Sequence, residues 1–289
     1  MEEVIRSETN GIQDGSEFGC HHTLDACWQT APFHMHPHYE FYLFLHGHAQ
    51  IVIEDERFDA HPGDLFVFHP GFIHRAVLLD HACPYERFYF YATRKVLAGI
   101  SDEHFSLLEL LEKARRDHNF SFHMDEDTTA RFIRLIESFD QTPLSQDPTV
   151  PLMNLCRIQM LSLLVGKTML HQESLSPRQP DRISQVIRYI NDHIQEPLRL
   201  DTLAEQFYIS KYTLLHDFKS YANISVHQYI LYKRISYAQH LLRHGISPGN
   251  AAKESGFNDY AGFYRAFVRQ NQITPQAYYQ ANHVSLQSP

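Results

Sequence analysis

The chain has 289 residues, with 43% hydrophobic and 20% charged side chains and a formal net charge of -9, which is typical of globular protein and predicts about two domains. Its longest apolar runs fall short of the roughly 20 residues that cross a bilayer, which excludes a membrane-spanning class and predicts no membrane partner. Four scattered cysteines without a CxxC pair, and a polar start without a signal-peptide pattern, indicate the reducing cytoplasm rather than a secreted disulfide scaffold.

The charge is divided unequally along the chain. From Arg178 onward there are 12 Lys and Arg against 8 Asp and Glu, whereas residues 1–177 carry 13 against 26. A weakly basic part beside an acidic part is the pattern of a nucleic-acid-binding half joined to a half that does not bind nucleic acid. Because the acidic part would repel phosphate, we expect it not to lie on DNA.

Short β-rich runs alternate with turn signals from Cys27 to Thr93. The runs LFLHG, AQIVIEDE and DLFVFHP have the length of strands, and Gly47, Pro62-Gly63 and Pro70-Gly71 separate them. Several short strands at this spacing predict an antiparallel β-barrel or sandwich over about residues 20–95.

A group of polar side chains is expected to converge inside this barrel. His34, His36 and Glu40 share one face of an extended strand, and His74 follows the Pro70-Gly71 turn. Three imidazoles and a carboxylate suit a divalent transition metal such as Fe, Mn, Ni or Zn. They could equally line a pocket and hydrogen-bond a small ligand or one another.

This arrangement resembles the cupin family, in its first motif by His34-x-His36-xxx-Glu40-xxxxxx-Gly47 and more loosely in its second by Gly63-Asp64 and Pro70-Gly71-xx-His74. The resemblance covers roughly residues 25–95. It implies a barrel with a central pocket, and we expect no obligatory cofactor there, a divalent transition metal being the alternative. The candidate metal ligands are His34, His36, Glu40 and His74. The candidate effector contacts are these four with Tyr42 and Trp28.

Helical periodicity follows the barrel over about residues 102–171. The third helix of this part, from about Val150 to Leu170, is apolar on more than one stripe, which predicts burial on two sides. One side could pack on the barrel and the other on a partner subunit, or the helix could simply cap its own barrel. The polar, Pro-containing stretch QESLSPRQPD at 172–181 then predicts an interdomain linker.

The segment from Leu198 to Tyr279 contains two copies of one plan. Each copy has a short apolar helix, a tight break and a second helix with a polar face and a phenylalanine near its end. A helix of roughly 18 residues, about 27 Å long, joins the copies. Two helices joined by a short turn make a helix-turn-helix, whose second helix can enter a DNA major groove. The expected DNA-facing residues are Ser210, Lys211, Tyr212, His216 and Lys219 in the first copy, and Asp259, Tyr260, Arg265 and Arg269 in the second.

The last hundred or so residues resemble the AraC/XylS family of bacterial transcription regulators. The ordered matches are Leu203-Ala204, Ser210, Phe218-Lys219, Tyr229, Arg234, Ala238, Leu241-Leu242, Ala251-Ala252, Gly256-Phe257, Phe263, Phe267 and Thr274-Pro275-xx-Tyr278. The family usually has glycine in the loop after each recognition helix, where this chain has Asn223 and Gln272. Since glutamine tolerates the left-handed backbone less well than glycine, the second loop is expected to be strained or shaped differently.

The expected fold is α+β: a cupin-like domain at 1–171, a linker at 172–181 and an all-α tandem helix-turn-helix domain at 182–289. The resemblance implies a cytoplasmic, homodimeric transcription regulator that binds double-stranded DNA and a small-molecule effector, with carbohydrate as the first candidate, and contacts RNA polymerase if it is an activator. Two alternatives remain open: a metal-dependent cupin enzyme with an appended DNA-binding domain, and a barrel that serves only for dimerisation. No catalytic residue is assigned.

Overall fold

The computed structural model describes residues 17–25, 33–80, 82–99, 101–140, 149–171, 175–222 and 224–283. Trp28, a predicted effector contact, and Asn223, in the first recognition-helix loop, lie outside these ranges. The chain forms two compact units, residues 1–179 and residues 180–289. Each unit is described by itself below.

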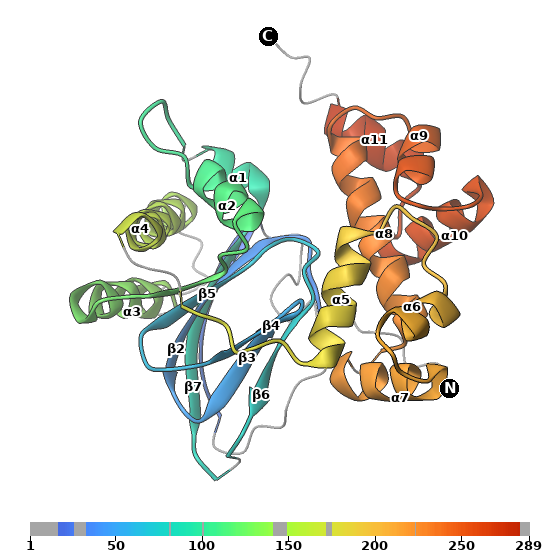
Figure 1. Ribbon diagram of the computed structural model, residues 1–289. Helices are drawn as coiled ribbons and strands as arrows, with labels where there is room; N and C mark the ends of the chain where they lie inside the picture. The colour runs from blue at the N-terminus through green and yellow to red at the C-terminus, as the bar shows by residue number, and fades with distance from the viewer. Residues whose placement is uncertain are drawn as a thin grey trace. The chain divides into compact units, whose positions relative to one another are not determined.

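The N-terminal unit contains two antiparallel sheets, as Figure 1 shows. The larger has the order β1-β7-β2-β5-β8 and the smaller the order β4-β3-β6. The predicted antiparallel β fold is therefore confirmed, although the strands make two sheets rather than one closed barrel. The strands are β1 (Phe18–Asp25), β2 (Tyr39–His46), β3 (Ala49–Ile53), β4 (Glu56–Asp59), β5 (Asp64–Phe68), β6 (His74–Leu78), β7 (Tyr85–Ala92) and β8 (Ser121–His123).

Strand β2 shows why the sequence of this region is almost continuously apolar. Its odd positions, such as Phe41 and Leu43, pack in one core with the helices, while Tyr42 and Phe44 pack in a second core that includes the smaller sheet. Successive side chains of a strand point to opposite faces, so a strand buried on both faces needs apolar residues at every position. The even positions of β2 therefore point between the two sheets.

Four helices cover the other face of the larger sheet, with α3 and α4 on the side away from β3, β4 and β6 in Figure 1. They are α1 (Arg94–Gly99), α2 (Leu107–Arg116), α3 (Glu126–Asp140) and α4 (Val150–His171). The buried face of α4 contributes Ile158, Leu161 and Val165 to the core. Its other apolar stripe is exposed: Leu163 is 53% and Leu152 64% exposed. The helix does cap its own sheet, and the described residues of its own unit leave uncovered the second side that the sequence predicts to be buried.

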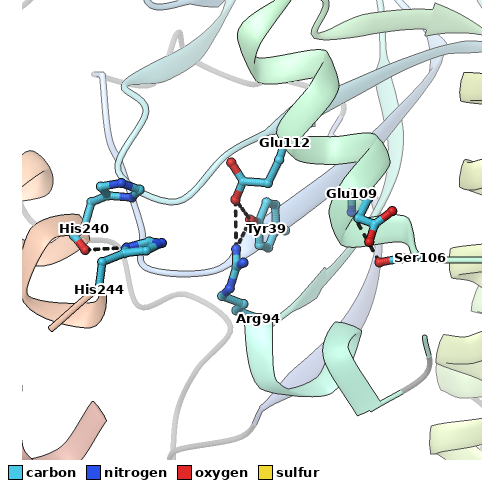
Figure 2. A network of polar contacts seen from close by, with 7 residues as sticks. All are labelled: Tyr39, Arg94, Ser106, Glu109, Glu112, His240 and His244. Carbon is cyan, nitrogen blue, oxygen red and sulfur yellow. Dashed lines mark hydrogen bonds and ion pairs between the residues drawn. The ribbon is translucent and has the colours of Figure 1, made fainter. Parts of the chain in front are cut away.

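A polar network ties the start of β2 to α1 and α2 (Figure 2). The Nη1 atom of Arg94 donates to Glu112 Oε1 at 2.8 Å and to the Tyr39 hydroxyl at 3.4 Å. Burial would raise the pKa of Glu112, but the hydrogen bond from Arg94 and the neighbouring arginine charges lower it below its usual value. Ser106 caps α2 by accepting a hydrogen bond from the backbone of Glu109 at 3.3 Å.

The described part of the predicted linker contacts the N-terminal unit. Leu175 packs at the edge of the core between the sheets, and its N–H donates to the Ser121 carbonyl at 3.1 Å. The Arg178 N–H donates to the Arg57 carbonyl at 2.7 Å, and its guanidinium lies 3.2 Å from Asp59. These residues are therefore held on the sheet edge beside β4 and β8.

The burial of His69 is expected to make the stability of the N-terminal unit depend on pH. Its side chain is 1% exposed, and burial, reinforced by the charge of Arg115 and opposed by Glu112, lowers its pKa to about 3. Near pH 5.5 the unfolded chain binds a proton at this position and the folded unit does not, so stability is lost as pH falls below about 6.5. Between pH 7 and pH 5.5, His69→Phe is expected to lose about 1 kcal/mol less unfolding free energy than the wild type.

Urea denaturation of the full chain at the two pH values measures this difference. The matched control is His104→Phe, because the His104 side chain is 83% exposed and should leave the pH dependence as it is. An equal loss of stability in His69→Phe and wild type would mean that His69 is not the group that titrates.

The C-terminal unit is all-helical, as predicted. Its helices are α5 (Arg182–Asp192), α6 (Leu200–Gln206), α7 (Lys211–Ala222), α8 (Val226–Arg243), α9 (Pro248–Glu254), α10 (Tyr260–Asn271) and α11 (Pro275–His283). Helix α8 begins with a capping box in which Ser225 and Gln228 satisfy each other's backbone N–H groups. On its last turn the His244 ring lies 2.8 Å from the His240 carbonyl (Figure 2). Across the described ranges of both units, every helix is too short or too polar to cross a membrane.

Candidate DNA interface and sensor site

The first recognition helix, α7, separates an apolar side from a polar side. Leu214 and Phe218 are fully buried, four residues apart, and fix the helix against its own unit. Ser210 begins the helix, because its Oγ accepts the N–H of Thr213 at 3.0 Å. Lys219 lies on the exposed side. The buried pair thus determines which side chains the helix presents outward.

The outward side of α7 carries apolar and aromatic surface. Tyr212 is 77% and Leu215 is 38% exposed. His216 lies beside Tyr212, and its Nδ1 is 2.9 Å from Asp217 Oδ1, which leaves Nε2 directed away from that carboxylate. Exposed aromatic and apolar surface next to cations suits sugar–phosphate and base edges better than water.

Lys211 has a partner within the protein. Its Nζ lies 2.9 Å from Asp201 Oδ1, and this hydrogen bond and charge lower the pKa of Asp201. Any contact of Lys211 with a phosphate would compete with this ion pair.

The second recognition helix, α10, repeats the plan. Phe263 and Phe267 are fully buried, again four residues apart. Asp259 caps the helix by accepting the Gly262 N–H at 2.7 Å. Tyr260, Arg265 and Arg269 are exposed. Asp259 therefore serves as a helix cap, while the two arginines are the cations of this face.

Helix α8 joins the two helix-turn-helix copies, each of which we call a reader, and with 18 residues it has the predicted length of about 27 Å. It is anchored through buried residues on both copies, among them Tyr229 and Ile235. Arg234 donates from Nε to the Ile194 carbonyl at 3.0 Å and from Nη2 to the Glu196 carbonyl at 2.7 Å, which holds α8 on the end of α5. The separation of the two recognition helices is thus set by a rigid element.

The loop after α10 has the strain that its sequence predicts. Gln272 is the C-cap of α10 and adopts φ +59, in the left-handed region that glycine favours. Its N–H donates to Val268, and its side-chain amide donates to the Arg269 carbonyl at 3.0 Å, which offsets part of the cost. The loop keeps its left-handed cap without glycine.

Gln272→Gly is therefore expected to raise the unfolding free energy of the C-terminal unit by about 0.5–1 kcal/mol. Urea denaturation measures it. The matched control is Gln280→Gly, an exposed glutamine within α11, where glycine should lower stability by about 1 kcal/mol. If Gln272→Gly destabilised the unit as Gln280→Gly does, the side-chain amide would outweigh the backbone strain.

The N-terminal unit brings the predicted imidazoles together just before β2. His34 and His74 form an isolated antiparallel bridge, and their rings lie 4.3 Å apart. His36 Nε2 lies 2.8 Å from Glu40 Oε2, and the ring of His36 is 4.8 Å from that of His74. All four candidate metal ligands of the sequence therefore lie in one cluster.

His38 also belongs to the cluster, although the sequence motif does not include it. Its ring stacks on His36 at 3.9 Å, and ligand atoms of His36, His38 and Glu40 all lie within 4.8 Å of one another. His38 has the same parity as His34, His36 and Glu40, so strand alternation alone could have identified it.

Apart from His36 Nε2, which faces the Glu40 carboxylate, two buried nitrogens of this cluster have no hydrogen-bond partner in the described structure, His38 Nδ1 and His74 Nε2. Burial, with the charge of a neighbouring histidine, lowers the pKa of His38 to about 3 and that of His74 well below 6.5. Burial would raise the pKa of Glu40, but the hydrogen bond and charge of His36 bring it below its usual value. The neutral imidazoles of His38 and His74 and the ionised carboxylate of Glu40 are in the protonation states in which these groups bind a metal ion.

Tyr42 lies deeper between the sheets. It is 6% exposed, and its hydroxyl is hydrogen-bonded to that of Tyr85. Burial, together with Tyr85, raises the pKa of Tyr42 well above its usual value, so the phenol stays protonated. It can offer an effector a ring edge, but its hydroxyl already has a partner.

The two halves of the chain match two known domains. Residues 20–158 match the AraC-like ligand binding domain, and residues 203–281 match a helix-turn-helix domain. The chain belongs to the AraC family of transcription regulators. It has the ligand-binding domain and the helix-turn-helix DNA-binding domain of that family.

Curated relatives of this AraC-family regulator are also named as regulators. The HTH-type transcriptional regulator YbfI of Bacillus subtilis is 24% identical over 80% of each chain. The regulatory protein PocR of Salmonella typhimurium is 33% identical over 34% of this chain and 33% of its own length. The HTH-type transcriptional activator RhaS of Escherichia fergusonii is 27% identical over 57% of this chain and 59% of its own. The chain therefore spans less than two thirds of the last two relatives.

Solved structures include the DNA-binding domain of AdpA in complex with a target DNA, 27% identical, with a TM-score of 0.36 over 37% of this chain and 99% of that one. ToxT from Vibrio cholerae is 12% identical, with a TM-score of 0.36 over 91% of this chain and 97% of that one.

Proposed function

We propose that this AraC-family regulator is a cytoplasmic activator that binds operator DNA through both recognition helices and responds to a small molecule in its N-terminal unit. The observation that carries the proposal is the paired recognition face, where exposed aromatic residues and cations stand over buried phenylalanines. The contacts would be Ser210, Lys211, Tyr212, His216 and Lys219 on the first reader, and Asp259, Tyr260, Arg265 and Arg269 on the second.

Selection from a random DNA pool, followed by fluorescence anisotropy on the enriched sequence, tests this function. The expected operator contains two half-sites about one helical turn apart, because one helix of fixed length separates the readers. In transcription assays on that operator, RNA polymerase should make more transcript when the regulator is present than when it is absent. A chain that enriches no sequence above random DNA would refute the proposal.

The effector would bind between the sheets, where His34, His36, Glu40, Tyr42 and His74 gather. Trp28, which lies outside the described residues, is proposed as a further contact. A thermal-shift screen of the full chain identifies the ligand, because a molecule that binds only the folded state raises the melting temperature. Carbohydrates are the first class to test.

The histidine cluster favours a second candidate function, in which the N-terminal unit binds a divalent transition metal. The donor set fits such an ion, because His38 Nδ1 and His74 Nε2 are buried, neutral and unpartnered beside the Glu40 carboxylate. His36 and His34 would complete the site. A bound ion would act as a Lewis acid toward an oxygen-bearing ligand.

Two experiments test whether the N-terminal unit binds a metal: metal analysis of the purified protein, and the thermal-shift assay with added Zn²⁺, Ni²⁺, Mn²⁺ and Fe²⁺. His74→Ala should abolish the shift, whereas His104→Ala, at an exposed histidine, should leave it intact. No bound metal and no shift would leave the cluster as a metal-free pocket wall. The metal-dependent enzyme remains the alternative that such a site would permit, while the relatives named above are regulators.

We also propose that the N-terminal units pair through α4. Its exposed stripe borders a groove of about 400 Å³ against α3, lined by Arg131, Arg134, Leu135, Met160, Leu163 and Leu164. Two copies related by a two-fold axis could cover this stripe for each other. Light scattering should give a dimer mass for the wild type and a monomer mass for Leu163→Arg. A monomeric wild type would rule out the pairing.

A further inference from the structure

The two helix-turn-helix turns are built with the same backbone hydrogen bonds. In each, the three residues after the first helix donate in the same order to carbonyls four, three and five positions back. In the first turn the donors are Phe207, Tyr208 and Ile209, to Leu203, Glu205 and Ala204 at 3.2, 3.1 and 3.0 Å. In the second the donors are Ser255, Gly256 and Phe257, to Ala251, Lys253 and Ala252 at 3.0, 3.1 and 3.2 Å.

The middle residue of each turn has a left-handed backbone, φ +53 at Tyr208 and φ +85 at Gly256. This region is unfavourable for every residue with a Cβ atom, and bulky side chains seldom occupy it. Glycine is what the second turn uses. The first turn instead holds an aromatic residue in a backbone conformation that is unfavourable for it.

Packing does not explain the tyrosine. Tyr208 is 95% exposed, the highest exposure among the large hydrophobic side chains of the described chain, so it adds nothing to the core of its unit. A strained residue that contributes no burial points to a role outside the folded unit.

The position of Tyr208 indicates what it would touch. It lies three residues before Lys211, where α7 begins, and four before Tyr212, which is 77% exposed. A recognition helix meets base edges through its N-terminal residues, so the preceding turn is placed at the edge of the groove, against the sugar–phosphate backbone. Tyrosine hydroxyls are common donors to phosphate oxygens, and the ring can pack on the sugar.

We propose that Tyr208 is a DNA-backbone contact of the first reader, donating from its hydroxyl to a phosphate oxygen at the groove edge. The contact rests on the proposed DNA binding. It adds affinity for DNA of any sequence and positions α7, and it makes up for the pairing of Lys211 with Asp201 on the same edge.

The test compares Tyr208→Gly and Tyr208→Phe in the full chain, by anisotropy on the selected operator and on a scrambled duplex. Tyr208→Gly should leave the melting temperature unchanged or raise it, yet weaken binding to both duplexes by about tenfold. Tyr208→Phe keeps the backbone and the ring, so it should weaken binding to both duplexes by about three- to tenfold. The dependence of affinity on salt should stay as in the wild type, because no cation is removed.

His118→Gly is the matched control. His118 lies after α2 in the N-terminal unit with φ +52, and its backbone repeats the cap, since Asn119 N–H donates to the Ala114 carbonyl at 2.8 Å. Relief of strain there should not change DNA affinity.

Unchanged affinity of both tyrosine variants for a duplex that the wild type binds would overturn the contact. It would also be overturned if affinity were unchanged and transcription fell, because Tyr208 would then meet RNA polymerase. A wild type that binds no DNA would instead refute the proposed function itself.

Discussion

Replacing Arg265 with alanine is expected to weaken binding to the selected operator by about 1–3 kcal/mol, roughly 5- to 150-fold. Arg265 lies on the exposed side of α10, which Phe263 and Phe267 anchor from behind. A guanidinium on a recognition helix can donate two parallel hydrogen bonds to guanine, and this is a strong base contact. Anisotropy titrations on the operator and on single-base variants of it measure the loss.

The control for Arg265→Ala is Lys219→Ala, near the end of α7. A phosphate contact carries no sequence information, so Lys219→Ala should weaken operator and scrambled DNA alike and reduce the salt dependence by about one ion. Arg265→Ala should instead reduce the ratio between the two duplexes and relax the preference at one base pair. An unchanged ratio would remove Arg265 from base recognition.

The two recognition helices, α7 and α10, differ in the side chains that they can offer to DNA. On α7 the exposed face offers His216 and Tyr212 but no arginine, and Lys211 is paired with Asp201. On α10, the Arg265 side chain is exposed. We therefore expect discrimination among sequences to depend more on the second reader, and the first to contribute more to general affinity.

Much of the C-terminal unit could be predicted because helical periodicity and capping act locally. The four-residue spacing of Leu214 and Phe218 fixes the buried side of α7, and Thr274-Pro275 fixes the start of α11, where Thr274 accepts the Ala277 N–H at 3.1 Å. The Gln272 strain was also predictable, since a glutamine stands where the backbone must turn left-handed.

The break between the two helices of the first copy is predicted from the sequence, but the left-handed backbone of Tyr208 is not, because no glycine marks it. A tyrosine after an apolar helix looks like a core residue, and only the pairing with Gly256 through identical hydrogen bonds reveals its backbone. His38 was missed for a different reason. The spacing of the cupin motif skips it, while the tertiary fold stacks it on His36.

Long-range features of the N-terminal unit were the hardest to predict. Local alternation predicts strands, but closure into one barrel depends on which edges pair, and here β4-β3-β6 stays a separate sheet from the one that contains β2. The exposed stripe of α4 shows the same limit, because apolar residues on two faces do not say what covers the second face.

Gly256 leaves little room for a side chain, and Gly256→Ala is expected to lower the unfolding free energy of the C-terminal unit by about 2–5 kcal/mol. Its φ of +85 disfavours any Cβ. A Cβ there would also lie 2.7 Å from the Ile194 carbonyl and 2.9 Å from Arg234 Nε, the two atoms that fasten α5 to α8. A backbone carbonyl cannot move aside as a flexible side-chain end can, so the clash should displace the arginine.

Urea denaturation and operator anisotropy together separate the two consequences of Gly256→Ala. Loss of stability follows from strain and crowding, whereas loss of affinity at a temperature where the unit stays folded would show that Arg234 sets the spacing of the readers. The matched control is Gly249→Ala in α9, where an added Cβ meets nothing within 4 Å and alanine should stabilise the helix by about 0.5–1 kcal/mol. Equal stability of the two variants would contradict the crowding at Gly256.

The two turns have the same backbone but differ in the space beside it. A Cβ at Gly256 would be crowded, whereas the Tyr208 side chain is exposed. The first turn is therefore the one at which the chain can place a side chain in contact with DNA.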